Sequence, residues 1–294
     1  MRIGKLSVMG LLAAALAGNC LATEGGGGAY PNGAEGFMAG ALPPPGVYFL
    51  DYMTYYRSDK FAGPDGDGVV PDFDLKAFAN VFRLVYVTKE QVLGASYAVH
   101  AFLPIANVDV TVPNASENRW GVGDIILDPC ILGWHTKNFH YTAGLDVYVP
   151  SGSYDATHLA NASRGCWTFE PVLGATFLSD GGLDVSAKLM YDFNAENPDT
   201  DYRSGQEFHV DYSVAQKVGP VSLGVGGYYY RQTTKDTCDA AATPLSGKGR
   251  TLAVGPELKY DYKNMSLMLK YQFEMATENR PEGDKAWLTF LCAF

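Results

Sequence analysis

Apolar and polar residues alternate along most of this chain. In the segment 264–276, Leu267 and Leu269 fall on one side of an extended chain, and Lys270 and Gln272 fall on the other. A side-chain period of two is that of a β-strand with one apolar and one polar face. Segments of this kind run for roughly ten residues, which is the length of a strand that crosses a membrane. The pattern therefore predicts an all-β protein made of amphipathic strands.

Twelve such segments follow one another. We predict strands at 46–57, 73–87, 91–103, 121–134, 139–150, 165–178, 182–194, 205–217, 220–231, 249–261, 264–276 and 284–294. The first two of these alternate least regularly. An even number of strands places both ends of the strand array on the same side of a membrane.

The connections between these segments alternate between short and long. The short connections are 88–90, 135–138, 179–181, 218–219 and 262–263. The longer connections are polar and rich in Gly, Pro, Asn and Asp, and they are 58–72, 104–120, 151–164, 195–204, 232–248 and 277–283. Short periplasmic turns and longer extracellular loops are typical of outer-membrane barrels. We therefore predict a transmembrane antiparallel β-barrel of about 12 strands over residues 46–294, with apolar residues toward lipid and polar residues toward the lumen.

The final strand supports this prediction. Residues Lys285 to Phe294 read K-A-W-L-T-F-L-C-A-F, alternate without a break and end on an aromatic side chain. The last strand of a barrel closes against the first, so that no backbone edge faces lipid. A terminal aromatic residue is also the usual assembly signal of these barrels. We expect the barrel-assembly machinery to recognise this strand through Phe294, and outer-membrane lipid to surround the barrel.

The amino terminus predicts export. Residues 1–22 have the layout of a secretory signal peptide, with two basic residues, an apolar run over 6–17 and cleavage expected after Ala22. A lipoprotein cysteine at Cys20 is less favoured, because the preceding Asn19 is not small. The apolar run is too short to span a membrane as a helix. We therefore expect the protein in the bacterial outer membrane.

The segment 23–45 has a different composition from the rest. It contains a run of four glycines and ends in Pro43-Pro44-Pro45, so it fits neither a regular strand nor a helix. Two interpretations remain open, a periplasmic tether and a plug folded into the barrel mouth. Tyr30, Phe37 and Leu42 favour a segment that packs against something.

Composition agrees with an exported barrel. Of the 294 residues only 18% are charged, and the mean hydropathy of −0.07 is that of strands with one apolar and one polar face. The net charge of −10 argues against nucleic acid as a partner. Cys166 and Cys238 both fall near predicted outer loops, where a disulfide could join them. Cys130 and Cys292 are better explained as residues packed within strands.

Ten charged or histidine residues fall on the predicted inward face. They are Glu170, Lys188, Asp192, Glu207, His209, Asp211, Glu257, Lys259, Lys270 and Glu274. Glu170 is expected beside Lys188, and Lys259 beside Lys270 and Glu274. One interpretation is a structural network that keeps buried charges paired. The other is a constriction that selects solutes. We favour a structural network that also narrows a small pathway.

Four further residues are expected near the extracellular mouth. They are Tyr202, Arg203, Gln206 and Arg280. Arg203 could pair with loop acids such as Asp201 and Glu278, or it could meet an incoming anionic aromatic compound. The structural role is the better supported of the two.

Catalytic and metal-binding patterns are weak. The sequence contains no G-x-S-x-G elbow and no H-E-x-x-H motif. His209 between Glu207 and Asp211 is the one suggestive group, and strand alternation alone would produce it. The run 65–68, D-G-D-G, resembles the start of a calcium loop but lacks the later ligands. We therefore expect no catalytic residues, no cofactor and no metal, and a protein that is not an enzyme.

Five stretches resemble a known family. They are E-G-G-G-G-A-Y-P-N-G-A-E-G-F at 24–37, A-L-P-P-P-G at 41–46, W-T-F-E-P at 167–171, D-T-D-Y-R-S-G-Q-E-F-H at 199–209 and E-N-R-P-E-G-D-K at 278–285. In these stretches the chain resembles the outer-membrane family of the meta-pathway of phenol degradation, whose members are often labelled transporters. The resemblance extends over essentially the whole exported chain. It implies an outer-membrane barrel linked with uptake of aromatic or other hydrophobic compounds, and it brings no catalytic residues.

These observations lead to one functional hypothesis and one alternative. We expect a passive outer-membrane channel that takes up small hydrophobic or aromatic solutes. The alternative is a structural or adhesive barrel with a sealed lumen, whose outer loops make the contacts. The state of the lumen, open, plugged or filled, separates the two.

Overall fold

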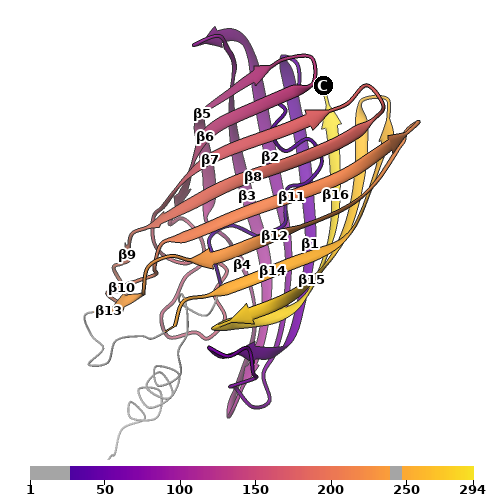
Figure 1. Ribbon diagram of the computed structural model, residues 1–294. Coiled ribbons are helices and arrows are strands. Elements are labelled where there is room, and N and C mark those ends of the chain that lie inside the picture. The colour runs from indigo at the N-terminus through magenta and orange to yellow at the C-terminus, as the bar shows by residue number, and fades with distance from the viewer. Residues whose placement is uncertain (1–26, 239–246) are drawn as a thin grey trace, which may run out of the picture.

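The computed structural model describes residues 27–238 and 247–294, which form a tilted barrel of β-strands (Figure 1). The wall strands are β1 (Gly46–Ala62), β2 (Asp74–Val92), β3 (Ala95–Val112), β4 (Ala115–Val122), β5 (Ile125–His135), β6 (Phe139–Val149), β7 (Thr168–Leu178), β8 (Leu183–Asn194), β11 (Glu207–Val218), β12 (Val221–Gln232), β14 (Arg250–Tyr262), β15 (Met265–Glu278) and β16 (Arg280–Ala293). Within the described residues, no helix is long and apolar enough to cross a membrane. The predicted signal peptide, residues 1–22, lies outside the described residues.

The wall is closed and antiparallel. Apart from β4, each wall strand pairs with the next along the chain, and β1 pairs with β16 to complete the ring, with Tyr52 opposite Thr289. β4 and β5 share one place in the wall, because both pair with the same edge of β3. β4 pairs with its second half, Ile105–Val112, and β5 pairs with its first half, 96–102. The thirteen strands of the sheet therefore make twelve wall positions. The predicted twelve-stranded transmembrane barrel is confirmed.

The two ends of the barrel differ as the lengths of the connections predict. Tight turns, such as those at 93–94 and 263–264, lie at one end of the wall. At the other end, β9 (Glu196–Asn197), β10 (Tyr202–Arg203) and β13 (Thr237–Cys238) form a small separate sheet (Figure 1, lower left). By the rule that periplasmic turns are short, the first end faces the periplasm and the small sheet faces outward.

One predicted outer loop is instead a β-hairpin. The segment 104–120 lies almost wholly in β3 and β4, which are joined at 113–114. The run 105–112, I-A-N-V-D-V-T-V, continues the alternation of β3, and Asn114 accepts the left-handed conformation that the tight turn requires (φ 66°). The prediction of a long irregular loop was wrong because this alternating run was not recognised as strand.

Two other connections also lie elsewhere than predicted. Residues 88–90 belong to β2, and the chain turns at Leu93 and Gly94, whose φ angles are 53° and 74°. The predicted loop 277–283 is also wrong, because β15 and β16 are separated by Asn279 alone, again at positive φ (55°). Each of these turns contains a residue with a positive φ angle. The composition of a segment alone does not reveal which residue adopts that conformation.

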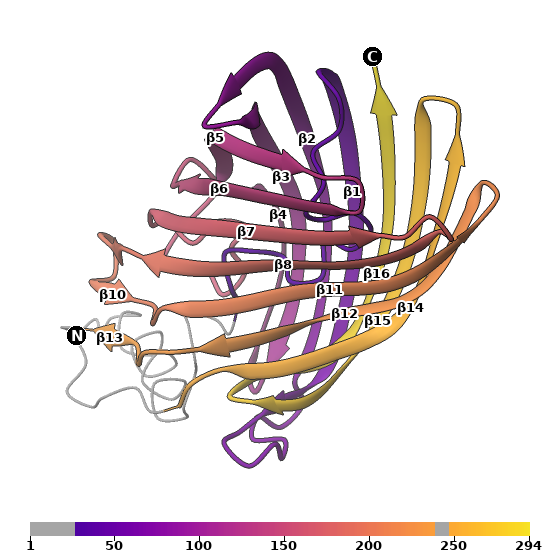
Figure 2. The ribbon, with the colours of Figure 1, turned by 45° about the horizontal axis from the view of Figure 1, so that its top comes forward.

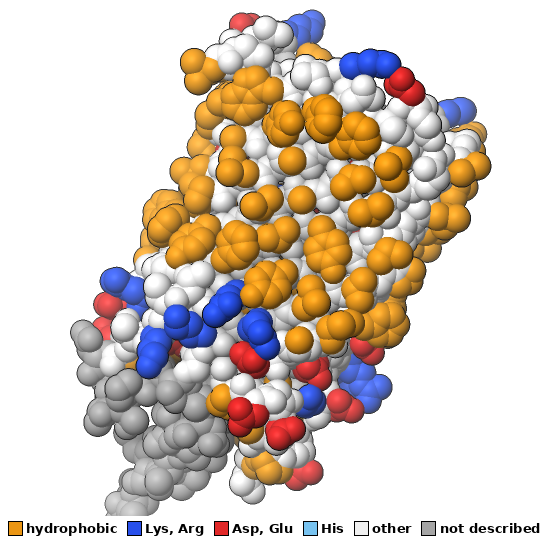
Figure 3. Space-filling view, in the orientation of Figure 1, with side chains coloured by type: hydrophobic (Ala, Val, Ile, Leu, Met, Phe, Trp, Pro, Cys, Tyr) orange, Lys and Arg blue, Asp and Glu red, His pale blue; other side chains and the backbone are white. Residues whose placement is uncertain are grey.

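The two faces of the wall have opposite polarity. On β8, the side chains of Val185 and Leu189 are 40% and 39% exposed, whereas Lys188 and Asp192 are 6% and 0% exposed. On the side seen in Figure 3, apolar side chains cover the wall, and charged side chains lie toward its two ends. This is the distribution expected of a wall surrounded by lipid.

The cysteines do not form the disulfide that the sequence left open. Cys166 and Cys238, both within the described residues, are not joined by a disulfide. Cys130 lies in β5 and Cys292 in β16, but Cys130 is exposed and therefore not packed as expected, whereas Cys292 is partly buried.

Candidate functional site: the plugged lumen

Residues 27–45, which we call the plug, lie inside the barrel. Figures 1 and 2 show this indigo segment running among the strands of the wall, and its hydrogen bonds reach strands on several sides of the lumen. It contains turns but no strand or helix. The described part of the predicted segment 23–45 therefore lies within the lumen, which is where the plug interpretation expects it.

Lumen side chains satisfy the backbone of the plug. The amides of Gly33 and Glu35 donate to the carboxylate of Asp211 at 2.8 and 3.1 Å, and the Tyr30 hydroxyl donates to the same carboxylate at 2.6 Å. Nearer the periplasmic end, the Gly40 amide donates to Thr176 Oγ1 at 2.9 Å. An irregular buried segment needs such partners, because it has no ladder of its own.

A lysine of β15, three wall positions from β11, also binds this part of the plug. Lys270 Nζ donates to the carbonyl oxygens of Gly33, Ala34 and Glu35 at 2.6, 2.6 and 3.0 Å. Its side chain is 6% exposed, so these carbonyls replace the water that an ammonium group would otherwise bind. Asp211 and Lys270 together fix the turn at Gly33, which has a φ of +85°.

A second set of contacts ties the plug to β2. Arg83 Nη1 donates to Glu35 Oε1 at 2.9 Å, and Nη2 lies 2.9 Å from His100 Nδ1. His100 Nε2 in turn lies 2.6 Å from Asp146 Oδ1. Burial alone would raise the pKa of the Glu35 carboxyl. The positive charge of Arg83, followed by those of the lumen lysines, outweighs burial and holds this pKa below its ordinary value. A chain of polar contacts therefore links the plug to three strands of the wall, β2, β3 and β6.

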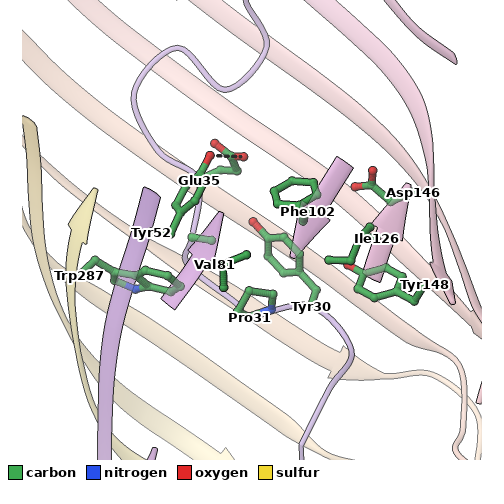
Figure 4. A pocket seen from close by; sticks show the side chains of 11 residues that line it. Tyr30, Pro31, Glu35, Tyr52, Val81, Phe102, Ile126, Asp146, Tyr148 and Trp287 are labelled. Carbon is green, nitrogen blue, oxygen red and sulfur yellow. Dashed lines mark hydrogen bonds between the residues drawn. The ribbon is translucent and has the colours of Figure 1, made fainter. Parts of the chain in front are cut away.

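Two cavities border the plug. The smaller one, about 30 Å³, is enclosed largely by aromatic rings, with Tyr30 of the plug facing Phe102 and Tyr148, and Tyr52 hydrogen-bonded to Glu35 (Figure 4). The larger one, about 280 Å³, lies between the plug and the wall. Its apolar lining includes Leu42, Leu50, Val85, Ile131 and Leu291, and its charged lining includes Arg83, Asp146, Lys188, Lys259 and Lys270.

The structure places the ten predicted lumen residues as follows. Eight are buried inside the barrel: Glu170, Lys188, Asp192, Glu207, His209, Asp211, Glu257 and Lys270. Lys259 and Glu274 are partly buried. The expected pairing is different, since Lys188 Nζ approaches Asp146 at 4.0 Å instead of Glu170, and Lys259 Nζ pairs with Asp261 at 3.2 Å instead of Glu274. Sequence alternation gives the face of a residue but not the direction of a long side chain.

The predicted mouth residues divide into two groups. Tyr202 and Arg203 form β10 in the outer sheet, where Arg203 Nη2 lies 3.7 Å from Glu196 instead of Asp201 or Glu278. Gln206 accepts a hydrogen bond from the backbone amide of Asn194 at 2.9 Å.

Arg280 lies deeper than predicted. Its side chain is buried, and its guanidinium sits over the ring of Tyr230, 4.1 Å from the ring centroid. The residue therefore belongs to the lumen below the outer sheet.

Several residues that hold the plug were missed by the sequence analysis. They are Tyr52, Arg83, His100, Asp146, Thr176 and Asp184. All except Tyr52, which follows Asp51, lie between two apolar residues of the strand, as Asp146 does between Leu145 and Val147. A polar residue at such a position was the available signal for a lumen contact.

Comparison with known proteins identifies the family. Residues 58–290 match the family described as the putative MetA-pathway of phenol degradation. The chain belongs to this family. A search of the curated proteins found no match to this chain.

Solved structures show the fold of this family member. The crystal structure of an outer membrane channel from Pseudomonas putida F1 is 19% identical, covers 87% of this chain and 98% of its own, and superposes with a TM-score of 0.78. The transport unit of the autotransporter AIDA-I from Escherichia coli is 9% identical, covers 85% of this chain and 90% of its own, and has a TM-score of 0.52. The family member thus has the β-barrel fold of these bacterial outer-membrane proteins.

Proposed function

We propose that this barrel is a passive outer-membrane channel for small hydrophobic or aromatic compounds, closed by its plug until the plug shifts. The observation that carries the proposal is the construction of the plug. It fills the lumen, yet it is held by side-chain hydrogen bonds and one ion pair instead of being a strand of the wall. Such contacts can be exchanged for water or solute without opening the β-ladder.

The larger cavity supports the choice of solute. At about 280 Å³ it exceeds the roughly 150 Å³ of an engineered apolar cavity that binds benzene. Leu42 and Ile131 line it together with Arg83 and Lys188, so apolar surface and positive charge lie side by side. Apolar contact supplies most of the affinity for such a solute, and the charged groups orient it. The family description, which refers to phenol degradation, agrees with this class of compound.

The experiment compares the full chain with a variant that lacks residues 27–45. Both are refolded, checked by heat-modifiable gel mobility and inserted into planar bilayers. We expect rare, small conductance steps for the full chain and larger, frequent steps for the variant. Benzoate, which combines a ring with a carboxylate, should block the current of the variant more strongly than acetate at the same concentration.

The alternative is a sealed structural or adhesive barrel whose outer loops make the contacts. The density of the plug contacts favours it, because Lys270 alone holds three plug carbonyls. Silence in both constructs, with folding confirmed, would contradict a channel and favour this alternative. Conductance that benzoate and acetate affect equally would leave a channel but contradict the proposed solute class.

A further inference from the structure

Three carboxylates lie side by side in the outer half of the lumen. Glu207 of β11 is directly opposite Asp192 of β8, and the register of β7 with β8 places Glu170 opposite Asp192 from the other side. All three residues are 0% exposed. Like charges directly across a ladder destabilise it, and a buried carboxylate requires a partner for its charge.

The protein supplies only part of the compensation. Glu207 Oε1 lies 3.6 Å from Arg164 Nη2, and Glu170 Oε2 accepts a hydrogen bond from Tyr148 at 3.2 Å. Three of their oxygens have no donor within the described residues, namely Glu170 Oε1, Asp192 Oδ1 and Glu207 Oε2, although Asp192 lies within hydrogen-bonding reach of both Glu170 and Glu207. Acceptors that face one another on adjacent strands need either protons shared between the carboxyl groups or a bound cation.

A histidine faces the same place. His209 Nδ1 lies 2.6 Å from Asn32 Oδ1 of the plug, so this nitrogen carries the proton that the amide oxygen accepts. His209 Nε2 then presents its lone pair toward Asp192 Oδ2 at 3.0 Å and the orphaned Glu207 Oε2 at 3.9 Å. An imidazole whose second nitrogen is fixed by a hydrogen bond is a typical metal ligand.

The ligand atoms already converge. Those of Glu170, Asp192 and His209 lie within 4.8 Å of one another. A zinc ion bonded at about 2.1 Å holds its ligands roughly 3 to 4 Å apart, so a small contraction completes the site. We propose that Glu170, Asp192 and His209, with Glu207 as a fourth donor, bind a divalent transition-metal cation of the Zn²⁺ class. The imidazole nitrogen favours this class over Ca²⁺ and Mg²⁺, which prefer oxygen ligands alone.

The site adjoins the plug. Asn32 holds the far side of the His209 ring, Tyr30 packs edge-on against it at 5.8 Å between ring centroids, and a Cβ on Gly28 would lie 3.0 Å from Glu207 Oε2. A metal ion that fixes His209 would also fix its partner Asn32, and therefore favours the docked plug. Metal binding itself does not depend on transport, whereas this effect on the plug rests on the proposed channel function.

The test uses the full chain refolded in detergent after treatment with a chelator. His135 and His140, an exposed pair at the periplasmic end, could bind zinc adventitiously, so every protein carries His140→Gln. Zn²⁺ is titrated by calorimetry, and Co²⁺ is added separately because its visible absorption reports nitrogen and oxygen ligands. We expect one Zn²⁺ per barrel, and at least a tenfold weaker affinity in both Asp192→Asn and His209→Gln.

Asp180→Asn is the control, because Asp180 is an exposed carboxylate paired with Lys137, apart from both the cluster and the plug. It should bind Zn²⁺ as the parent does. Heat-modifiable mobility confirms that each variant folds, and Asp192→Asn removes a like-charge contact, so it should fold at least as well. The proposal would be overturned if the parent bound no stoichiometric Zn²⁺, or if the cluster variants and the control had equal affinity for Zn²⁺. Protons shared between the carboxyl groups would then account for the buried cluster.

Discussion

The carboxylate of Glu35 in the plug and the guanidinium of Arg83 in β2 form an ion pair of 2.9 Å inside the barrel, with side chains only 18% and 16% exposed. Within the described residues, this is the one salt bridge that joins the plug to the wall. A pair shielded from solvent contributes more than one at the surface, and breaking it leaves the remaining charge poorly compensated. The position of the plug should therefore depend on this contact.

Replacing Glu35 by glutamine should release the plug more often. A hydrogen bond to a charged group contributes about 1.5–3 kcal/mol, so the ratio of closed to open channels should fall roughly tenfold to a hundredfold. Single-channel recording in planar bilayers measures this ratio. Asp180→Asn, which breaks the exposed pair with Lys137, is the control and should leave the ratio unchanged. An unaltered ratio in Glu35→Gln would show that the pair does not hold the plug.

Acidic solution should break the ion pair between Glu35 and Arg83. Burial opposes the charge of Glu35, but Arg83 and the lysines outweigh it, so the pKa of the docked carboxyl lies below its usual value. The contribution of a group with a lowered pKa is present above the undocked pKa, about 4.3, and is lost as pH falls through the docked pKa. We expect the open fraction of the parent protein to rise below about pH 4. The rise should be smaller in Glu35→Gln, which isolates this carboxyl from other lumen acids.

The strands of the wall could be predicted from the sequence because the signal for each strand lies within that strand. Alternation on β8 or β15 records which side chains meet lipid, and this requires no knowledge of the partner strand. The plug contacts could not be predicted in this way. The Gly33 amide and the Asp211 carboxylate that accepts its hydrogen bond are 178 residues apart, and no periodicity links them. The same limit explains why Lys188 was assigned to Glu170, since its reach to Asp146 depends on the side-chain conformation.

Phe294 should affect assembly more than stability. Its side chain is 81% exposed, while its backbone amide donates to the Val47 carbonyl at 2.9 Å, a bond that Phe294→Ala preserves. We expect the free energy of unfolding in lipid vesicles to change by no more than about 0.5 kcal/mol. The amount of folded barrel in the outer membrane of expressing cells should fall several-fold, as measured by heat-modifiable mobility in membrane fractions. Equal amounts in cells would contradict recognition of this residue by the assembly machinery.

Asp128 replaces part of the backbone ladder where β5 is irregular. Its carboxylate accepts hydrogen bonds from the amides of Cys130 and Leu145 at 2.7 and 2.9 Å, beside Pro129, which has no amide hydrogen to donate. Asp128→Ala leaves two backbone donors without an acceptor at about 1–3 kcal/mol each, so the free energy of unfolding in urea should fall by roughly 2–6 kcal/mol. Asp128→Asn keeps one acceptor oxygen and should lose less. Equal losses in the two variants would show that the hydrogen bonds are not the cause.

At Gly40 the plug lies directly against the backbone of the wall. A Cβ at this position would lie 2.4 Å from the backbone nitrogen of Ala175, nearer than real Cβ contacts allow, and Ala175 belongs to the rigid ladder of β7. Gly40→Ala should therefore move the plug and not the wall, which raises the conductance and exposes the plug to protease while heat-modifiable mobility stays normal. Gly27→Ala is the matched control, because a Cβ there meets nothing within 4 Å. A closed, protease-resistant Gly40→Ala barrel would mean that the wall yields at β7, and that the plug is more firmly held than its side-chain hydrogen bonds imply.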